Sequence, residues 1–149
     1  MSFLPPEDFY NVEEMTPAEC LKLARSYQNA SIALKKVWLK RDPASRAPFR
    51  FTAVHSIELF LTTYLLVKGE PWSSVRSMGH SLDRRHERAA DLGLKMNRQT
   101  KLGLDAISGS REYLRSRYSA RETSVVQLNK LEAILKQVSE TVSHVLEKV

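Results

Sequence analysis

The stretch from Phe51 to Val67 is the most apolar part of the chain, and it restricts the fold more than any other feature. Its apolar residues cover a wide helical surface, which is typical of a helix at the centre of a bundle. The stretch is short for a membrane span and contains polar residues such as His55 and Glu58. Lys68 and Gly69 suit the end of a helix. The positive charge of Lys68 is favourable at a helix C-terminus, and Gly69 readily adopts the left-handed backbone conformation that ends a helix. We therefore expect a core helix that ends at Gly69.

The rest of the chain also favours helices, because no part of it alternates apolar and polar residues as a half-buried strand does. Thr16-Pro17-Ala18-Glu19 combines a threonine N-cap, a proline in the first turn and a glutamate that completes a capping box. A helix is predicted from there to about Lys40. Pro48 is predicted to open the core helix after a short polar connector. Ser81 is predicted to open the next helix, which ends at Gly93.

Three further helical segments are expected towards the C-terminus: a weakly patterned one within 94–109, one over 111–118, and a final helix that begins at Thr123 or the serine after it. The final helix carries an apolar seam with alternating steps of three and four residues: Leu128, Leu131, Leu135, Val138, Val142, Val145 and Val149. We predict an all-α, up-and-down bundle of four to five helices. It forms a single domain over 1–149, with 1–15 as an N-terminal extension.

The chain is basic, with 23 lysines and arginines against 17 aspartates and glutamates and a formal net charge of +6. The excess is concentrated between Pro71 and Thr123, where eleven basic residues face six acidic ones. Such a surplus permits an anionic partner without requiring one. The arginines form either a solvated face or an anion-binding face.

Cys20 is the only cysteine, which excludes an intrachain disulfide and a cysteine-rich zinc site. The N-terminal residues lack the basic flank and apolar run of a secretory signal, so we expect a cytoplasmic protein without membrane attachment. The four histidines do not have the spacing of metal ligands, and the chain has no glycine-rich phosphate loop. We expect neither a metal nor a cofactor.

Glu58 is the one acid of the apolar stretch, and an ionised carboxylate there needs a cation or a donor. His55 lies three residues earlier on the same helical face, and His80 can approach if the next helix packs antiparallel. The favoured interpretation is a buried structural group of Glu58 with His80. The alternative is an acid–base site, for which the sequence places no second carboxylate or nucleophile nearby.

Arg111, Arg115 and Tyr118 share one face of a predicted helix at positions i, i+4 and i+7, with Arg117 beside them. Two arginines and a tyrosine can hold a phosphate and stack a base. In the alternative interpretation, the arginines pair with local acids such as Glu112 and the tyrosine belongs to the bundle.

Three motifs resemble elements of one family of helical modules. Ala53 through Gly69, with Glu58-Leu59, resembles its long second helix. Gly79-His80-Ser81-Leu82 is similar to its Gly-His-Asp-Leu entry to a helix, and Arg117-Tyr118 to an Arg-Tyr pair in its penultimate helix. The family is HEPN, a module found with nucleotidyltransferases in prokaryotes, and the resemblance extends from about Thr16 to Leu146.

The chain departs from the family pattern at several positions. Thr62 and Thr63 stand where a lysine often follows the Glu-Leu element, and Ser81 replaces an aspartate. Active HEPN ribonucleases carry an arginine and a histidine, with four to six residues between them, late in the bundle, and this chain has no such histidine there. Arg50 and His55 have that spacing but lie in the core helix. The resemblance therefore implies the branch without the ribonuclease motif.

These observations support three hypotheses of function. The first is a non-catalytic binding module, forming a homodimer, that recognises a nucleotide, RNA or a partner nucleotidyltransferase through an arginine-rich face. Its expected contacts are Arg76, Arg84, Arg111, Arg115, Arg117 and Tyr118. The second is a metal-independent ribonuclease that uses Arg50 and His55 across a dimer interface. The third is a structural or regulatory bundle for protein contacts.

Overall fold

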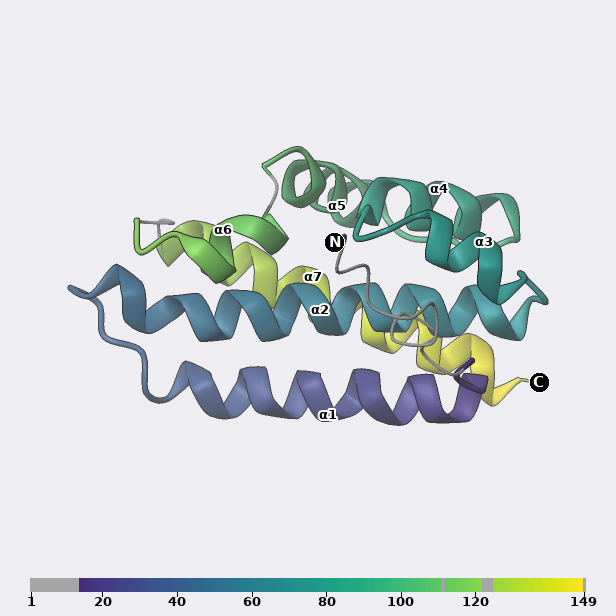
Figure 1. Ribbon diagram of the computed structural model, residues 1–149, viewed down its shortest axis with the longest axis horizontal. Coiled ribbons are helices and arrows are strands. Elements are labelled where there is room, and N and C mark those ends of the chain that lie inside the picture. The colour runs from purple at the N-terminus through teal and green to yellow at the C-terminus, as the bar shows by residue number, and fades with distance from the viewer. Residues whose placement is uncertain (1–13, 111, 122–124, 149) are drawn as a thin grey trace, which may run out of the picture.

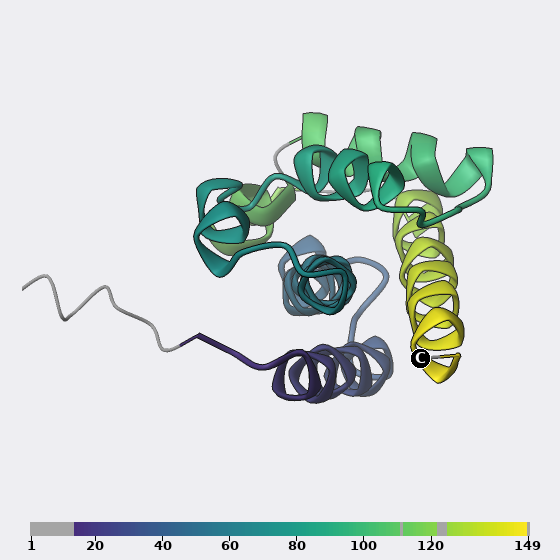
Figure 2. The same cartoon turned by 90° about the vertical axis from the view of Figure 1, so that its right-hand side faces the viewer.

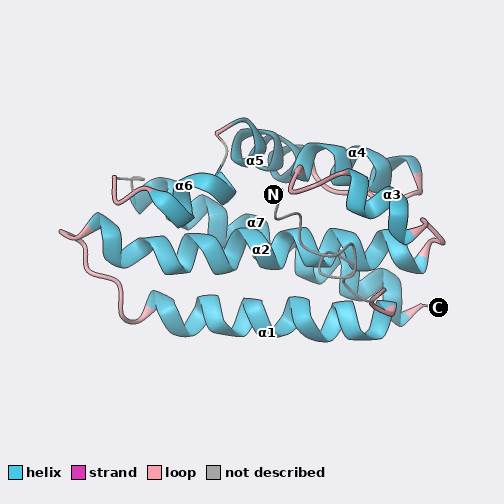
Figure 3. Cartoon of the chain, viewed as in Figure 1, coloured by secondary structure: helices cyan, strands magenta, loops and turns pink. Residues whose placement is uncertain are grey.

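The computed structural model describes residues 14–110, 112–121 and 125–148, and these contain helices and connecting turns but no strand (Figures 1 and 3). The all-α prediction is confirmed. The described residues form seven helices rather than four or five: α1 (Pro17–Lys35), α2 (Pro43–Val67), α3 (Trp72–Ser77), α4 (Leu82–Asp91), α5 (Arg98–Gly109), α6 (Glu112–Tyr118) and α7 (Val125–Glu147). Most of the predicted N-terminal extension, Arg111, Thr123 and Val149 lie outside the described residues.

The core helix predicted from the apolar stretch is α2, and it occupies the middle of the molecule. Figure 2 shows α2 end-on, with α1 below it, α7 to one side, and α4 and α5 above. It contacts α1, α7, α6 and α4, and several of its apolar side chains, among them Phe60 and Leu65, have no exposed surface. None of the described helices is long and apolar enough to cross a membrane.

The predicted helix ends that depend on local chemistry are confirmed. The Thr16 hydroxyl accepts the backbone N–H of Glu19 at 3.2 Å, and the Glu19 carboxylate accepts that of Thr16 at 3.0 Å. Ser81 caps α4 through its side-chain oxygen. Gly69 and Gly93 follow α2 and α4 with positive φ angles of 87° and 100°, which glycine adopts without strain.

The connection between α1 and α2 differs from its prediction. The first helix ends at Lys35 rather than near Lys40, and α2 begins at Pro43 rather than at Pro48. Pro43 in the first turn is already suited to a helix start, so the helix needs no further signal. The Arg46 guanidinium donates to the backbone carbonyls of Leu39 and Lys40, at 2.9 and 2.7 Å. These two hydrogen bonds provide partners for the carbonyl groups of the connector. Pro48 is accommodated inside α2.

The apolar seam of the last helix packs as predicted. Leu128, Val138 and Val142 of α7 have no exposed surface, and α7 lies against α2 and α5. A side chain at Gly103 of α5 would overlap Ile134 of α7, so the two helices touch at this point. The segment after Gly69, which the sequence predicted as a loop, contains the additional short helix α3.

Candidate functional site

Glu58 on α2 is the centre of a cluster of ionisable side chains, and its own side chain is only 10% exposed. Nδ1 of His80 lies 3.2 Å from each carboxylate oxygen, and Nδ1 of His55 lies 3.6 Å from Oε2. Nη2 of Arg85 lies 3.4 Å from Oε1. Burial by itself raises the pKa of Glu58, but its contacts with His55, Arg85 and His80 outweigh burial and hold the pKa below its usual value. The carboxylate is therefore ionised at neutral pH.

Arg85 is the member of this cluster that the sequence analysis did not select. Its side chain is buried, donates from Nε to the Thr62 hydroxyl at 3.0 Å, and donates from Nη1 to the Gly79 carbonyl at 2.6 Å. It therefore joins α4 to α2 and to the loop that carries His80. A signal was present: Arg85 shares the face of α4 that buries Leu82 and Ala89, where a solvated arginine would not lie.

His55 is held between α1 and α2 by aromatic contacts. The Tyr27 ring meets it edge-on with centroids 4.5 Å apart, and the Phe51 ring lies parallel to it at 6.1 Å. The guanidinium carbon of Arg117, from α6, lies 4.9 Å from the centre of the Phe51 ring. Arg117 thus reaches the same surface of α2 as His55.

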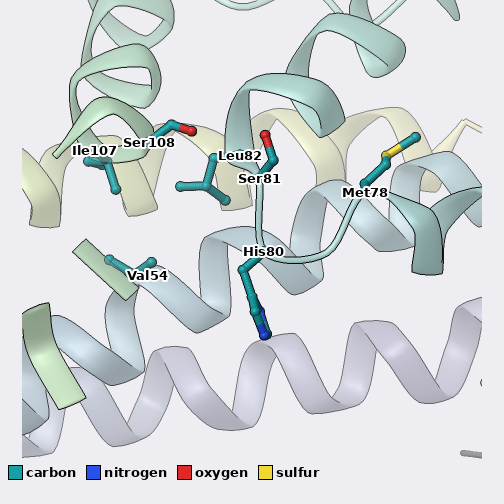
Figure 4. Close-up of a pocket in the computed structure, with 7 residues that line it drawn as sticks. All are labelled: Val54, Met78, His80, Ser81, Leu82, Ile107 and Ser108. Carbon is teal, nitrogen blue, oxygen red and sulfur yellow. The ribbon is translucent and has the colours of Figure 1, made fainter. Parts of the chain in front are cut away.

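These groups form one depression on α2, which we call the His55–His80 site and define by Phe51, His55, Glu58, His80 and Arg117. A pocket of about 290 Å³ adjoins it and shares His80 and Val54 as lining residues. Figure 4 shows His80 leaving the loop before α4, with its ring directed away from Ser81 and Leu82.

The expected arginine-rich face is divided in the structure. Arg117 belongs to the His55–His80 site, whereas Arg115, two residues earlier, lines a separate pocket between α5 and α7. Arg76 and Arg84 are exposed on α3 and α4, and Figure 1 shows α3 and α6 near opposite ends of the molecule. Tyr118 is 81% exposed at the end of α6. Arg111 lies outside the described residues.

Arg50 and His55 do not meet, although their spacing satisfies the ribonuclease pattern. Residues five apart on an α-helix point about 140° away from each other around its axis. Arg50 is 2% exposed and lines the pocket of Arg115, whereas His55 lines the depression beside Glu58. The arginine that accompanies His55 is therefore Arg117, which comes from α6.

Cys20 is buried, and its thiol donates to the Leu59 carbonyl over 3.4 Å. Burial raises the pKa of this thiol, so it suits a packing role better than a nucleophilic one. Within the described ranges, no group of three or more His, Cys, Asp or Glu side chains has an arrangement that could hold a metal ion.

The arrangement defines the chemistry that the site can offer. A carboxylate that faces Nδ1 of two histidines orients both rings and directs their Nε2 atoms away from itself. Arg117 adds a planar set of donors suited to a phosphate. The described part of the chain is thus all-helical, and its site brings a carboxylate and a histidine of α2 together with a histidine from the loop before α4 and an arginine from α6. Comparisons of the chain with protein-family models, curated proteins and solved structures find no match.

Proposed function

We propose that this protein is a non-catalytic, HEPN-like binding module that recognises RNA or a nucleotide through the His55–His80 site and the adjoining end of α6. The observation that carries the proposal is the position of Arg117, an exposed arginine packed on Phe51 in the same depression as His55 and His80. Aromatic contact limits the freedom of the guanidinium, so less conformational entropy is lost when it binds a phosphate.

Two neighbouring side chains supply the other contacts that a nucleotide needs. His80 is 43% exposed and can donate to a phosphate oxygen. Tyr118 follows Arg117 directly, and its exposed ring can stack a base, which is worth about 1–3 kcal/mol in single-stranded complexes. The positive net charge favours approach of the phosphate backbone. Single-stranded RNA suits this surface better than a duplex, whose bases are already stacked.

The HEPN assignment is part of the same proposal. It is supported by the contact between Glu58 and His80, because the Glu-Leu and Gly-His motifs that carry the resemblance meet at this pair. The proposal also includes that the protein forms a homodimer and binds a partner nucleotidyltransferase. Light scattering of the purified chain tests the dimer, and a stable mass of one chain at all concentrations would remove it.

The binding proposal is tested with a fluorescently labelled single-stranded RNA and two matched variants. Arg117→Gln removes a charge from the site, whereas Arg98→Gln removes one from an exposed position on α5. We expect the first to weaken binding at least tenfold, as for a lost charged hydrogen bond of about 1.5 kcal/mol or more, and the second to change it less than twofold. The affinity should fall as salt rises. Equal effects of the two variants, or insensitivity to salt, would contradict the proposal.

A second candidate function, metal-independent RNA cleavage, is favoured by the two histidines that share Glu58. One imidazole would take the proton of the ribose 2′-hydroxyl while its oxygen attacks phosphorus. The other would protonate the departing 5′-oxygen, leaving a 2′,3′-cyclic phosphate and a 5′-hydroxyl end. Arg117 would offset the charge of the transition state in place of Arg50.

Incubation of the purified protein with RNA in the presence of a chelator tests this second candidate. Cleavage that is lost in His55→Ala and His80→Ala, and retained in His144→Ala at an exposed position on α7, would establish it. Wild-type protein that binds RNA and leaves it intact would remove cleavage and keep the binding function.

A further inference from the structure

A second cavity of about 250 Å³ lies where α5, α6 and α7 meet the first half of α2, and three basic residues line it. We call it the cationic pocket and define it by Arg50, Arg115 and Lys130, which come from three different helices. The described residues that line this pocket include no aspartate or glutamate. Among the described lining residues, the basic side chains therefore outnumber the acidic ones.

The basic residues differ in their exposure to water. Arg115 and Lys130 are exposed, whereas Arg50 is almost fully buried. Arg50 already has an interaction within the protein, so Arg115 and Lys130 are the cations that an incoming anion meets. An anionic group between Arg115 and Lys130 would be attracted by both of these exposed cations.

Most of the remaining wall of the pocket is apolar. Leu128, Leu131 and Ile134 of α7 line it, and each is less than one-tenth exposed. The contact of Gly103 with Ile134 holds α5 against α7 beside the pocket, so its walls belong to packed helices. Its volume is just below the range of about 300–1,000 Å³ that is typical of pockets for drug-sized ligands. Such a space suits a small molecule.

We propose that the cationic pocket binds a small organic anion. Its phosphate or carboxylate group lies between Arg115 and Lys130, and its aromatic or short aliphatic body lies against Leu128 and Leu131. This site is separate from the His55–His80 site, and the inference does not depend on RNA binding there. Arg115 and Arg117, although close in sequence, line different cavities.

Calorimetric titration of the full chain tests the inference with four probes: phenyl phosphate, phenylacetate, inorganic phosphate and benzyl alcohol. At least one aromatic anion should bind saturably with a Kd of about 1 mM or below, as expected for a ligand of this size. The first two probes distinguish a phosphate from a carboxylate head group. Inorganic phosphate and benzyl alcohol should each bind at least about tenfold more weakly, because the first lacks the apolar body and the second lacks the anionic group.

Variants locate the binding. Arg115→Gln and Lys130→Gln should each weaken it about tenfold, and Ala106→Phe should weaken it by filling the cavity from an exposed position on α5. Lys136→Gln, at an exposed position elsewhere on α7, is the matched control and should bind as the wild type does. Circular dichroism checks that each variant keeps its helices. Absence of saturable binding by both aromatic anions, or an equal loss in Lys136→Gln and Lys130→Gln, would overturn the inference.

Discussion

The Glu58 cluster and the arginines of α6 use charge in opposite ways. Around Glu58, partners from α2, α4 and the loop before α4 surround a buried carboxylate and keep it ionised. On α6, Arg115 and Arg117 stay exposed, and each borders a cavity. A buried charge must be satisfied within the protein, whereas an exposed one can be satisfied by a ligand. The comparison assigns the buried pair of Glu58 and Arg85 to the stability of the fold, and the exposed Arg115 and Arg117 to the two proposed binding sites.

The largest expected effect comes from removing the buried carboxylate. Glu58→Gln should destabilise the protein by about 3–5 kcal/mol in urea unfolding, because Arg85 would keep a buried charge without its acid. Glu132→Gln is the control, since its ion pair with Lys35 has both side chains about 40% exposed. That change should cost less than about 1 kcal/mol. Equal costs would show that burial does not distinguish the two ion pairs.

A double-mutant cycle measures the interaction between Glu58 and Arg85. Arg85→Met alone should destabilise by about 2–4 kcal/mol, since its hydrogen bonds to Thr62 and Gly79 are lost with its charge. Combined with Glu58→Gln, the total should be smaller than the sum of the single effects by about 1 kcal/mol or more. Strict additivity in the measured free energies of unfolding would indicate that the two side chains do not interact.

The stability contributed by Glu58 should depend on pH. Its pKa in the folded protein lies below the ordinary value of 4.5, so the unfolded chain takes up the proton first as the pH falls. The contribution is complete above about pH 4.5 and is lost as the pH falls through the lower, folded-state pKa. Urea unfolding between neutral pH and about pH 3 should therefore show a smaller loss of stability in Glu58→Gln than in the wild type. An identical pH dependence in the two proteins would contradict this assignment.

Substitutions of the α6 arginines should change ligand affinity while leaving the free energy of unfolding almost unchanged. Arg117→Gln should cost less than about 1 kcal/mol in unfolding, as expected for an exposed cation–π contact, while it weakens RNA binding. Arg115→Gln should leave RNA binding within twofold of the wild type and reduce the affinity for the small organic anion. If both variants weakened RNA binding equally, the two arginines would act on one surface rather than two.

The smallest effect on stability is expected at Tyr118. Because its ring is largely exposed, Tyr118→Ala should change the free energy of unfolding by less than about 0.5 kcal/mol. RNA affinity measured by anisotropy should nevertheless fall by at least about fivefold, through the lost stacking. Tyr118→Phe keeps the ring and should bind nearly as well as the wild type. A comparable loss in the phenylalanine variant would assign the contact to the hydroxyl group instead.

The features that sequence predicted well are those with a local cause. The capping box at Thr16, the glycine ends of α2 and α4, and the seam of α7 all depend on residues within a few turns of one another. The contact of His80 with Glu58 was foreseen because an isolated acid in an apolar helix needs a partner. The start of α2 at Pro43 was missed, because Pro48 also suits the first turn of a helix and the choice between the two prolines depends on contacts of the connector, such as those of Arg46.

By itself, the sequence determined that the chain is helical, that the stretch from Phe51 to Val67 is its core, and that Glu58 requires a partner. Periodicity and burial of apolar surface require these features in any bundle. The tertiary structure alone decided that Arg85 joins Glu58 and that Arg115 and Arg117 line different cavities. Side chains two positions apart on a helix point in different directions, and what each one meets depends on helices distant in sequence.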